Sequence, residues 1–302
     1  MNVAMTCAAC GGTRLEPHLR VAGDAGTQGL IPTTDRFGTA LSDIVRCADC
    51  SHMQLARFPL EGELSEAYAE AASDDYVVEE EGQRHTARWI LERIERFTSR
   101  GALLDLGCWV GFLIAEARER GWDGLGVEPS EFASRYARER LGLDVVTGDL
   151  MKAELPERHF QAVFMGDVIE HLPNVGAALD RVASLLRLDG VLALTLPDAG
   201  SRVARVMGRR WWSVIPTHVQ YFTRDSMRVA LERHGYVPVS METAPKAFSA
   251  GYYLERIGGY NRGLSRTLIR GAEALRIADR LWVPDLRDRM LVIARGPAQT
   301  PE

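Results

Sequence analysis

Four of the five cysteines occur as two pairs whose spacing suits a metal ion. The pairs are Cys7 with Cys10 and Cys47 with Cys50, whereas Cys108 stands alone. Two residues separate the thiols of each pair, so one tight turn can present both sulfurs to the same ion. Two such pairs complete a closed tetrahedral site of four thiolates, which is typical of structural zinc and leaves no open position for catalysis.

Two disulfides or a redox-active pair are the alternative interpretations. We expect a cytoplasmic protein, because the first residues resemble no signal peptide and no run approaches the roughly 20 apolar residues of a membrane helix. That compartment disfavours structural disulfides, and no βαβ pattern of the thioredoxin kind adjoins either pair. Zinc is therefore the prediction, with His18 and His52 at the surface or behind the ligands.

Acidic residues follow three successive apolar segments in the middle of the chain. Asp105, Glu128 and Asp149 lie at or just beyond the ends of these segments. Because the carboxyl ends of parallel strands meet at one edge of a sheet, we expect the three carboxylates in one site. Asp105 can receive an ammonium group, Glu128 both hydroxyls of a ribose, and Asp149 the amino group of an adenine. The set predicts a nucleoside that carries an amino acid.

The segment LDLGCWVG around the first of these acids supplies Gly107 and Gly111. A glycine directly after a strand lets the backbone approach a ligand closely. The segment lacks the full G-x-G-x-x-G pattern and has no neighbouring basic residue, which disfavours a dinucleotide. Cys108 in this loop, together with Pro129 and Leu150 beside two of the acids, completes the residues expected to contact the cofactor.

A histidine in the segment MGDVIEHLP can act as a general base. Imidazole titrates near neutral pH, so we expect His171 to take the proton of an acceptor group, with Glu170 orienting the ring. His218, in the segment THVQYFT, is the alternative base. Two other interpretations stay open: Asp167, Glu170 and His171 could hold a magnesium ion, or His171 could merely cap the following helix.

Aromatic residues surround the second of these histidines. Trp211 and Trp212 precede it and Tyr221 follows it. Flat aromatic faces suit sugar rings or aglycones, so these side chains are expected to line an acceptor pocket. The alternative is that both tryptophans simply pack against the sheet.

The elements that must position these residues alternate between strands and helices from residue 101 onward. The pattern predicts an α/β, doubly wound sheet with helices at 112–120, 131–141, 175–186 and 225–233. Ser130 is a good N-cap and Gly142 a good helix stop. We expect three parts: a zinc-binding module over 1–58 with a hairpin from 44–46 and 53–56, a helical linker over 59–100, and the main domain over 101–302, in which 245–284 forms a helical insertion.

Residues 101–197 resemble class I S-adenosylmethionine-dependent methyltransferases. The segment LDLGCxxG resembles their first motif, VEPS their second-strand acid and GDL their adenine-side acid. The resemblance implies a Rossmann-like sheet of seven strands with the last strand antiparallel, and it places Asp167 near the transferring methyl. Trp109 departs from the family, which commonly has glycine there, so its side chain must point away from the methionine moiety or reshape the pocket.

Two further segments narrow the resemblance. DVIEHL and HVQYFT are similar to segments of the subgroup that includes ubiquinone-pathway O-methyltransferases, and VRCADCSHMQL resembles the zinc knuckle of bacterial methyltransferases from antibiotic, deoxysugar and polysaccharide pathways. The implied function is methyl transfer to a small-molecule acceptor, such as the hydroxyl of a sugar, sugar nucleotide or glycosylated natural product. Whether the acceptor atom is oxygen, nitrogen or carbon stays open.

Charge bears on the alternatives. An rRNA or tRNA methyltransferase with an RNA-binding zinc module would be basic, whereas this chain has a net charge of -5 and balances the arginines of its first sixty residues with acids. Nucleic acid is therefore disfavoured as a partner. A non-catalytic protein that binds the cofactor or a partner is the third alternative, and Trp109 keeps it open. The helical insertion could cover the active site or form the surface of a homodimer.

Overall fold

The computed structural model describes residues 5–23, 37–59 and 75–297. Residues 60–74 of the predicted linker lie outside these residues, as do residues 24–36. The described part of the linker contains two helices, α2 (Asp75–Val78) and α3 (Glu80–Ile94).

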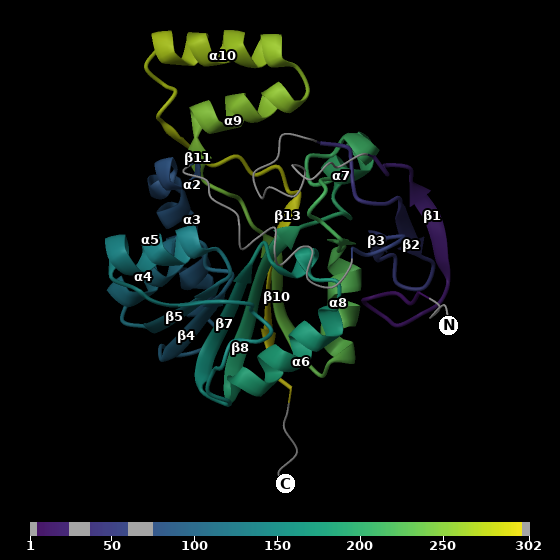
Figure 1. Cartoon of the computed structure of the whole chain (residues 1–302), viewed down its shortest axis with the longest axis vertical. Coiled ribbons are helices and arrows are strands. Elements are labelled where there is room, and N and C mark those ends of the chain that lie inside the picture. Colours follow the sequence, from purple (N-terminus) through teal and green to yellow (C-terminus); the bar gives the residue numbers. More distant parts are fainter. Residues whose placement is uncertain (1–4, 24–36, 60–74, 298–302) are drawn as a thin grey trace.

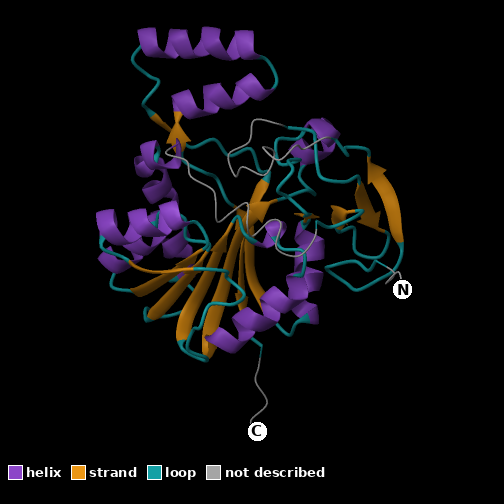
Figure 2. Ribbon diagram, viewed as in Figure 1, coloured by secondary structure: helices purple, strands orange, loops and turns teal. Residues whose placement is uncertain are grey.

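A seven-stranded sheet forms the body of the molecule (Figures 1 and 2). In spatial order its strands are β10 (Val237–Thr243), β13 (Arg289–Arg295), β8 (Leu186–Pro197), β7 (Phe160–Gly166), β4 (Ala102–Leu106), β5 (Asp123–Glu128) and β6 (Asp144–Thr147). The strands from β8 to β6 are parallel, and β13 is antiparallel to both of its neighbours. The predicted Rossmann-like sheet with an antiparallel last strand is therefore confirmed.

Helices cover both faces of this sheet because its strands are apolar on both sides. Neighbouring strand residues alternate between two cores: Leu103 and Phe164 belong to the one that includes α3, whereas Leu104 and Met165 belong to the other. The main helices are α4 (Phe112–Glu119), α5 (Glu131–Leu141), α6 (Val175–Leu185) and α8 (Arg224–Arg233). They match the predicted ranges within a residue or two.

Local signals set the ends of two of these helices. The Ser130 side chain accepts a hydrogen bond from the Ala133 amide and starts α5, and Gly142 ends it in the left-handed conformation. Thr223 caps α8. The N-cap of α6 is Asn174, so His171 is not the cap that one interpretation of the sequence suggested.

The N-terminal module is a small antiparallel sheet of β1 (Leu15–Leu19), β2 (Ile44–Cys47) and β3 (Met53–Leu55), which includes the predicted hairpin. Its fourth strand is β9 (Gln220–Tyr221), which comes from the main domain and pairs with β3. The predicted boundary near residue 58 therefore does not separate two sheets, because one sheet contains residues from both sides of it.

The insertion forms a helical hairpin of α9 (Ala250–Arg256) and α10 (Arg262–Ala274), which projects beyond the sheet (Figure 1). At its base, β11 (Phe248–Ser249) pairs with β12 (Leu281–Trp282). Shorter elements complete the described chain: α7 (Arg202–Met207) and the 3-10 turns η1 (Ile169–His171), η2 (Gly208–Arg210) and η3 (Ile257–Gly259). None of the helices in the described ranges is long and apolar enough to cross a membrane.

Candidate cofactor and acceptor site

A cavity of about 1470 Å³ lies at the carboxyl ends of the parallel strands and extends beneath the insertion. It brings together most of the residues predicted from the sequence. Those that line it are Asp105, Gly107, Cys108, Glu128, Pro129, Asp149, Leu150, Asp167, Glu170, His171, Trp212 and His218. Gly111, Trp211 and Tyr221 are not among the lining residues.

The two glycines of the first loop have different roles. Gly107 has a φ of +80°, and a Cβ there would meet Val168 at 2.5 Å, so only glycine fits this wall of the cavity. Gly111 is the N-cap of α4 with a φ of +86°, and a Cβ there would meet Leu143 at 2.6 Å. Gly111 thus serves the start of the helix and its packing, away from the cavity.

Two buried carboxylates stand at the ends of adjacent strands. Asp105 is 3% exposed and Glu128 is 4% exposed, and neither forms an ion pair with a basic side chain of the described residues. Burial, followed by repulsion from Glu128, raises the pKa of Asp105 to about 8. Burial raises the pKa of Glu128 to about 7. Such a pair creates a place where positive charge is favourable.

Backbone amides fix the Glu128 carboxylate. The amides of Trp109 and Ser130 each donate to one of its oxygens at 2.8 Å. Trp109 adopts a φ of +49°, which is unusual for a bulky residue, and its ring lines the cavity 6.5 Å from that of Phe132. The departure from glycine thus adds an aromatic wall to the pocket. Asp149 lies at the rim, where its carboxylate accepts from the Met151 amide at 2.8 Å.

Asp167 is held by two cations that the sequence analysis missed. Both Lys246 and Arg289 form ion pairs with its carboxylate, and together they hold its pKa well below the usual value despite burial. Lys246 lies shortly after β10, and Arg289 is the first residue of β13. Both residues are far from Asp167 in the sequence. The oxygens of Asp167 thus already have partners, and the possible cation-binding group of the described residues contains Glu170, His171 and His218 but not Asp167, unlike the magnesium alternative.

Glu170, His171 and His218 form a cluster on the same side of the cavity as Asp167. Each of the three offers one atom that could bind a metal ion, and these atoms lie within 4.8 Å of one another. His171 Nδ1 donates to the Thr217 carbonyl at 2.9 Å, and His218 Nδ1 donates to the Ser213 carbonyl at 2.8 Å. Because a carbonyl only accepts, each neutral ring carries its proton on Nδ1 and its lone pair on Nε2. Burial lowers the pKa of both rings.

Glu170 is 2% exposed, and neither oxygen has a hydrogen-bond partner among the described residues. Burial, followed by repulsion from Asp167, raises its pKa to about 8. No hydrogen bond from the His171 ring to Glu170 is found among the described residues; His171 Nδ1 donates to the Thr217 carbonyl instead.

The adjacent tryptophans divide between core and cavity. Trp211 is 3% exposed and packs in the core, whereas Trp212 lines the cavity and donates to Asp288 at 2.8 Å. The Tyr221 hydroxyl donates to the backbone carbonyl of His218 at 3.1 Å, and this buried side chain does not itself line the cavity. The alternative that the tryptophans pack in the core instead of lining the cavity therefore holds for Trp211 and not for Trp212.

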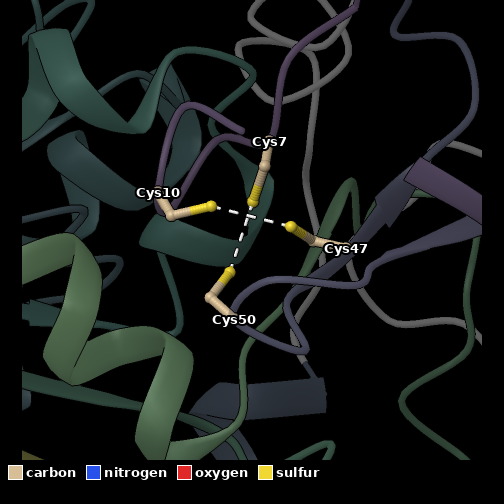
Figure 3. Close-up of side chains that lie close together, drawn as sticks. All are labelled: Cys7, Cys10, Cys47 and Cys50. Atoms are coloured by element: carbon tan, nitrogen blue, oxygen red, sulfur yellow. Dashed lines mark hydrogen bonds between the residues drawn. The ribbon is translucent and has the colours of Figure 1, made fainter. Parts of the chain in front are cut away.

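The four paired cysteines converge on one point (Figure 3). Sulfur atoms from different pairs lie close together, with Cys7 3.5 Å from Cys50 and Cys10 3.6 Å from Cys47. Tetrahedral zinc with bonds of about 2.3 Å would hold its sulfurs roughly 3.8 Å apart, so both the spacing and the donor set fit. None of the five cysteines forms a disulfide, so the structure does not support the disulfide alternative. His18 is exposed as expected, whereas His52 is fully buried.

Comparison with known proteins identifies the family of this chain. The methyltransferase domain family matches residues 78–241, more than half of the chain. The chain belongs to this family. Among curated members it is 30% identical over 96 residues to a ubiquinone biosynthesis O-methyltransferase of Rhodopseudomonas palustris, covering 30% of this chain and 38% of that protein. It is 25% identical over 226 residues to the C-methyltransferase NovU of Streptomyces niveus, covering 73% and 50%.

The chain therefore spans about two fifths of the first of these relatives and half of the second. Among solved structures, a chain of the complex between the Haloferax volcanii Trm112 methyltransferase activator and a methyltransferase superimposes with a TM-score of 0.50. The identity is 13%, and the match covers 77% of this methyltransferase-family chain and 97% of the other. This likeness concerns the fold alone.

Proposed function

We propose that the protein transfers a methyl group from S-adenosylmethionine to a small-molecule acceptor. The observation that carries this proposal is the pair of buried carboxylates, Asp105 and Glu128, which have no basic partner among the described residues. A cofactor with an ammonium group, a sulfonium and a ribose supplies the positive charge and the hydroxyl donors that such a pair needs. When bound, it supplies an electrophilic methyl group.

The cavity provides a partner for each end of that cofactor. Asp105 would hold the ammonium group, and Asp149 at the rim would accept from the adenine amino group. Glu128 would hold the ribose hydroxyls, because each carboxylate oxygen retains a second lone pair after accepting its backbone amide. The backbone at Gly107 allows close approach, while Cys108, Pro129 and Leu150 form the adjoining walls.

On the acceptor side, His171 is the base for a hydroxyl of a sugar, sugar nucleotide or glycosylated natural product. Its lowered pKa keeps the ring neutral at pH 7, and the Thr217 carbonyl fixes the tautomer that leaves a lone pair on Nε2. The ring would take the hydroxyl proton as the acceptor oxygen forms its bond to the methyl carbon. His218 has the same tautomer and is the alternative base.

Calorimetry with S-adenosylmethionine and S-adenosylhomocysteine tests the cofactor, and transfer of a labelled methyl group to candidate sugars tests the reaction. We expect binding of both cofactor forms, and loss of transfer in His171→Ala without loss of binding. Absence of binding would favour a non-catalytic protein that binds a partner, and transfer to RNA alone would favour the RNA alternative.

A second candidate is methyl transfer assisted by a divalent cation at Glu170, His171 and His218. It is favoured by the buried Glu170 carboxylate, which has no hydrogen-bond partner among the described residues and lies near two histidines with Nδ1 already bonded. Two nitrogens and one oxygen suit zinc, manganese or iron better than magnesium. Metal analysis distinguishes the candidates, because a second equivalent that disappears in Glu170→Gln would favour the cation.

We infer that the four paired cysteines hold a structural zinc ion. The support is the donor set and the sulfur spacing. The closed site would stabilise the module and take no part in the reaction.

A further inference from the structure

A continuous set of main-chain hydrogen bonds links the cysteine module to the acceptor side of the cavity. The Leu55 amide of β3 donates to the Val219 carbonyl at 3.0 Å. The Val219 amide in turn donates to the carbonyl of Glu170 at 2.9 Å. Three segments that are far apart in sequence thus form one hydrogen-bonded layer, with the module at one side and η1 at the other.

Two buried side chains reinforce this layer. His52 is fully buried, and its Nε2 lies 2.9 Å from Oε1 of Gln220. The Gln220 amide nitrogen donates to the carbonyls of Leu172 and Pro173 at 3.1 and 3.3 Å. Because that nitrogen is the amide's donor end, Oε1 is its acceptor end, and His52 is the donor to it through Nε2. Gln220 therefore joins the module to the two residues that directly follow His171.

β3 and His52, the residue before it, also contact the backbone near both cysteine pairs. The His52 carbonyl accepts from the amide of Cys47 at 2.8 Å. Two residues along the strand, Gln54 accepts from the Ala8 amide at 2.8 Å and donates to the Thr6 carbonyl at 3.0 Å. The turn that carries the second cysteine pair and the backbone on both sides of Cys7 therefore contact β3 or His52. The same residues bind Val219 and Gln220, which contact η1 and the residues after it.

We propose that His52 and Gln220 are positioning residues, through which the four-cysteine module sets the geometry of Glu170 and His171. The inference deepens the proposed function. It rests on that function only where it treats Glu170 and His171 as the acceptor side of the cavity. A shift of η1 away from the module would leave the Gln220 amide and two backbone carbonyls without partners in a buried setting, which is costly. The module is in this sense a wall of the acceptor site.

Hydrogen–deuterium exchange of the protein with S-adenosylhomocysteine tests the inference, because it requires no acceptor. The variants are Gln220→Ala and His52→Ala, with His52→Gln as the conservative replacement, whose amide nitrogen can take the place of Nε2. Gln161→Ala is the matched control, since Gln161 is also buried and donates to Thr98 and to the Asp189 carbonyl, outside the cavity.

We expect exchange in peptides covering 166–173 to become about tenfold faster or more in Gln220→Ala and His52→Ala. His52→Gln should restore protection, and Gln161→Ala should leave these peptides unchanged. Unchanged exchange in both alanine variants, equal opening in Gln161→Ala, or failure of His52→Gln to restore protection would overturn the inference. If S-adenosylhomocysteine does not bind to the unmutated protein, that result would instead count against the proposed function. Calorimetry measures this binding separately from the exchange of the 166–173 peptides.

Discussion

Replacing Glu128 by Gln perturbs the proposed ribose site while keeping the size of the side chain. One carboxylate oxygen becomes an NH2 group, which cannot accept from a backbone amide, so either Trp109 or Ser130 loses its partner. At a buried position such a loss costs about 1–3 kcal/mol of stability. Hydrogen bonds from ribose hydroxyls to a charged group contribute about 1.5–3 kcal/mol, so the variant should bind S-adenosylhomocysteine about 10- to 100-fold more weakly.

The same substitution changes how stability depends on pH. The folded pKa of Glu128 is raised from 4.5 to about 7, so folding takes up a proton in this range. The stability of the ligand-free protein should therefore fall as pH rises from 4.5 to 7, by about 3 kcal/mol from this group at roughly 1.4 kcal/mol per unit. Glu128→Gln lacks this component, so its deficit relative to the unmutated protein should shrink toward pH 7.

Calorimetry and urea unfolding at pH 5, 6, 7 and 8 measure both effects. Glu116→Gln is the matched control, because Glu116 is 3% exposed but pairs with Arg84 and Arg88 and does not line the cavity. That control should lose stability and keep its affinity. Wild-type affinity in Glu128→Gln, or a pH dependence of stability equal to that of the unmutated protein, would refute the reasoning.

Three further predictions follow from the site. Asp105 and Glu128 must be ionised to hold a cationic ligand, so the affinity for S-adenosylmethionine should rise between pH 6 and 8, with proton release that calorimetry in different buffers detects. With a hydroxyl acceptor, His171→Ala should lower kcat about 10²- to 10⁴-fold and leave cofactor affinity unchanged in a binding assay. Cys47→Ser should lower bound zinc below one equivalent and lower the Tm of the protein, as metal analysis and calorimetry would report; full zinc content would contradict the four-thiolate site.

The sequence predicted the main sheet well because its signals are local. Ser130, Gly142 and Thr223 mark helix ends through their own backbone and side-chain chemistry, and the apolar strands recur between them. The pairing of β3 with β9 escaped prediction, because a strand of two residues has no periodicity and its partner lies more than 160 residues away. The role of His52 escaped with it, since its burial depends on that pairing.

The candidate site was predictable at its cofactor end and less so at its acceptor end. Acids at strand ends meet wherever strands are parallel, so Asp105 and Glu128 could be placed from sequence. The cations on Asp167 could not, because Lys246 reaches it from the loop after β10 and Arg289 from the start of β13, both far away in sequence. Adjacent tryptophans must face different surroundings, but only the folded chain decides which one reaches the cavity.

A crystal structure of the protein with S-adenosylhomocysteine tests the central claim most directly. The account predicts the ligand in the described cavity, with its ribose hydroxyls on Glu128, its amino group on Asp105 and its adenine toward Asp149. A ligand bound elsewhere, or one that leaves the carboxylates of both Asp105 and Glu128 without contact, would contradict it.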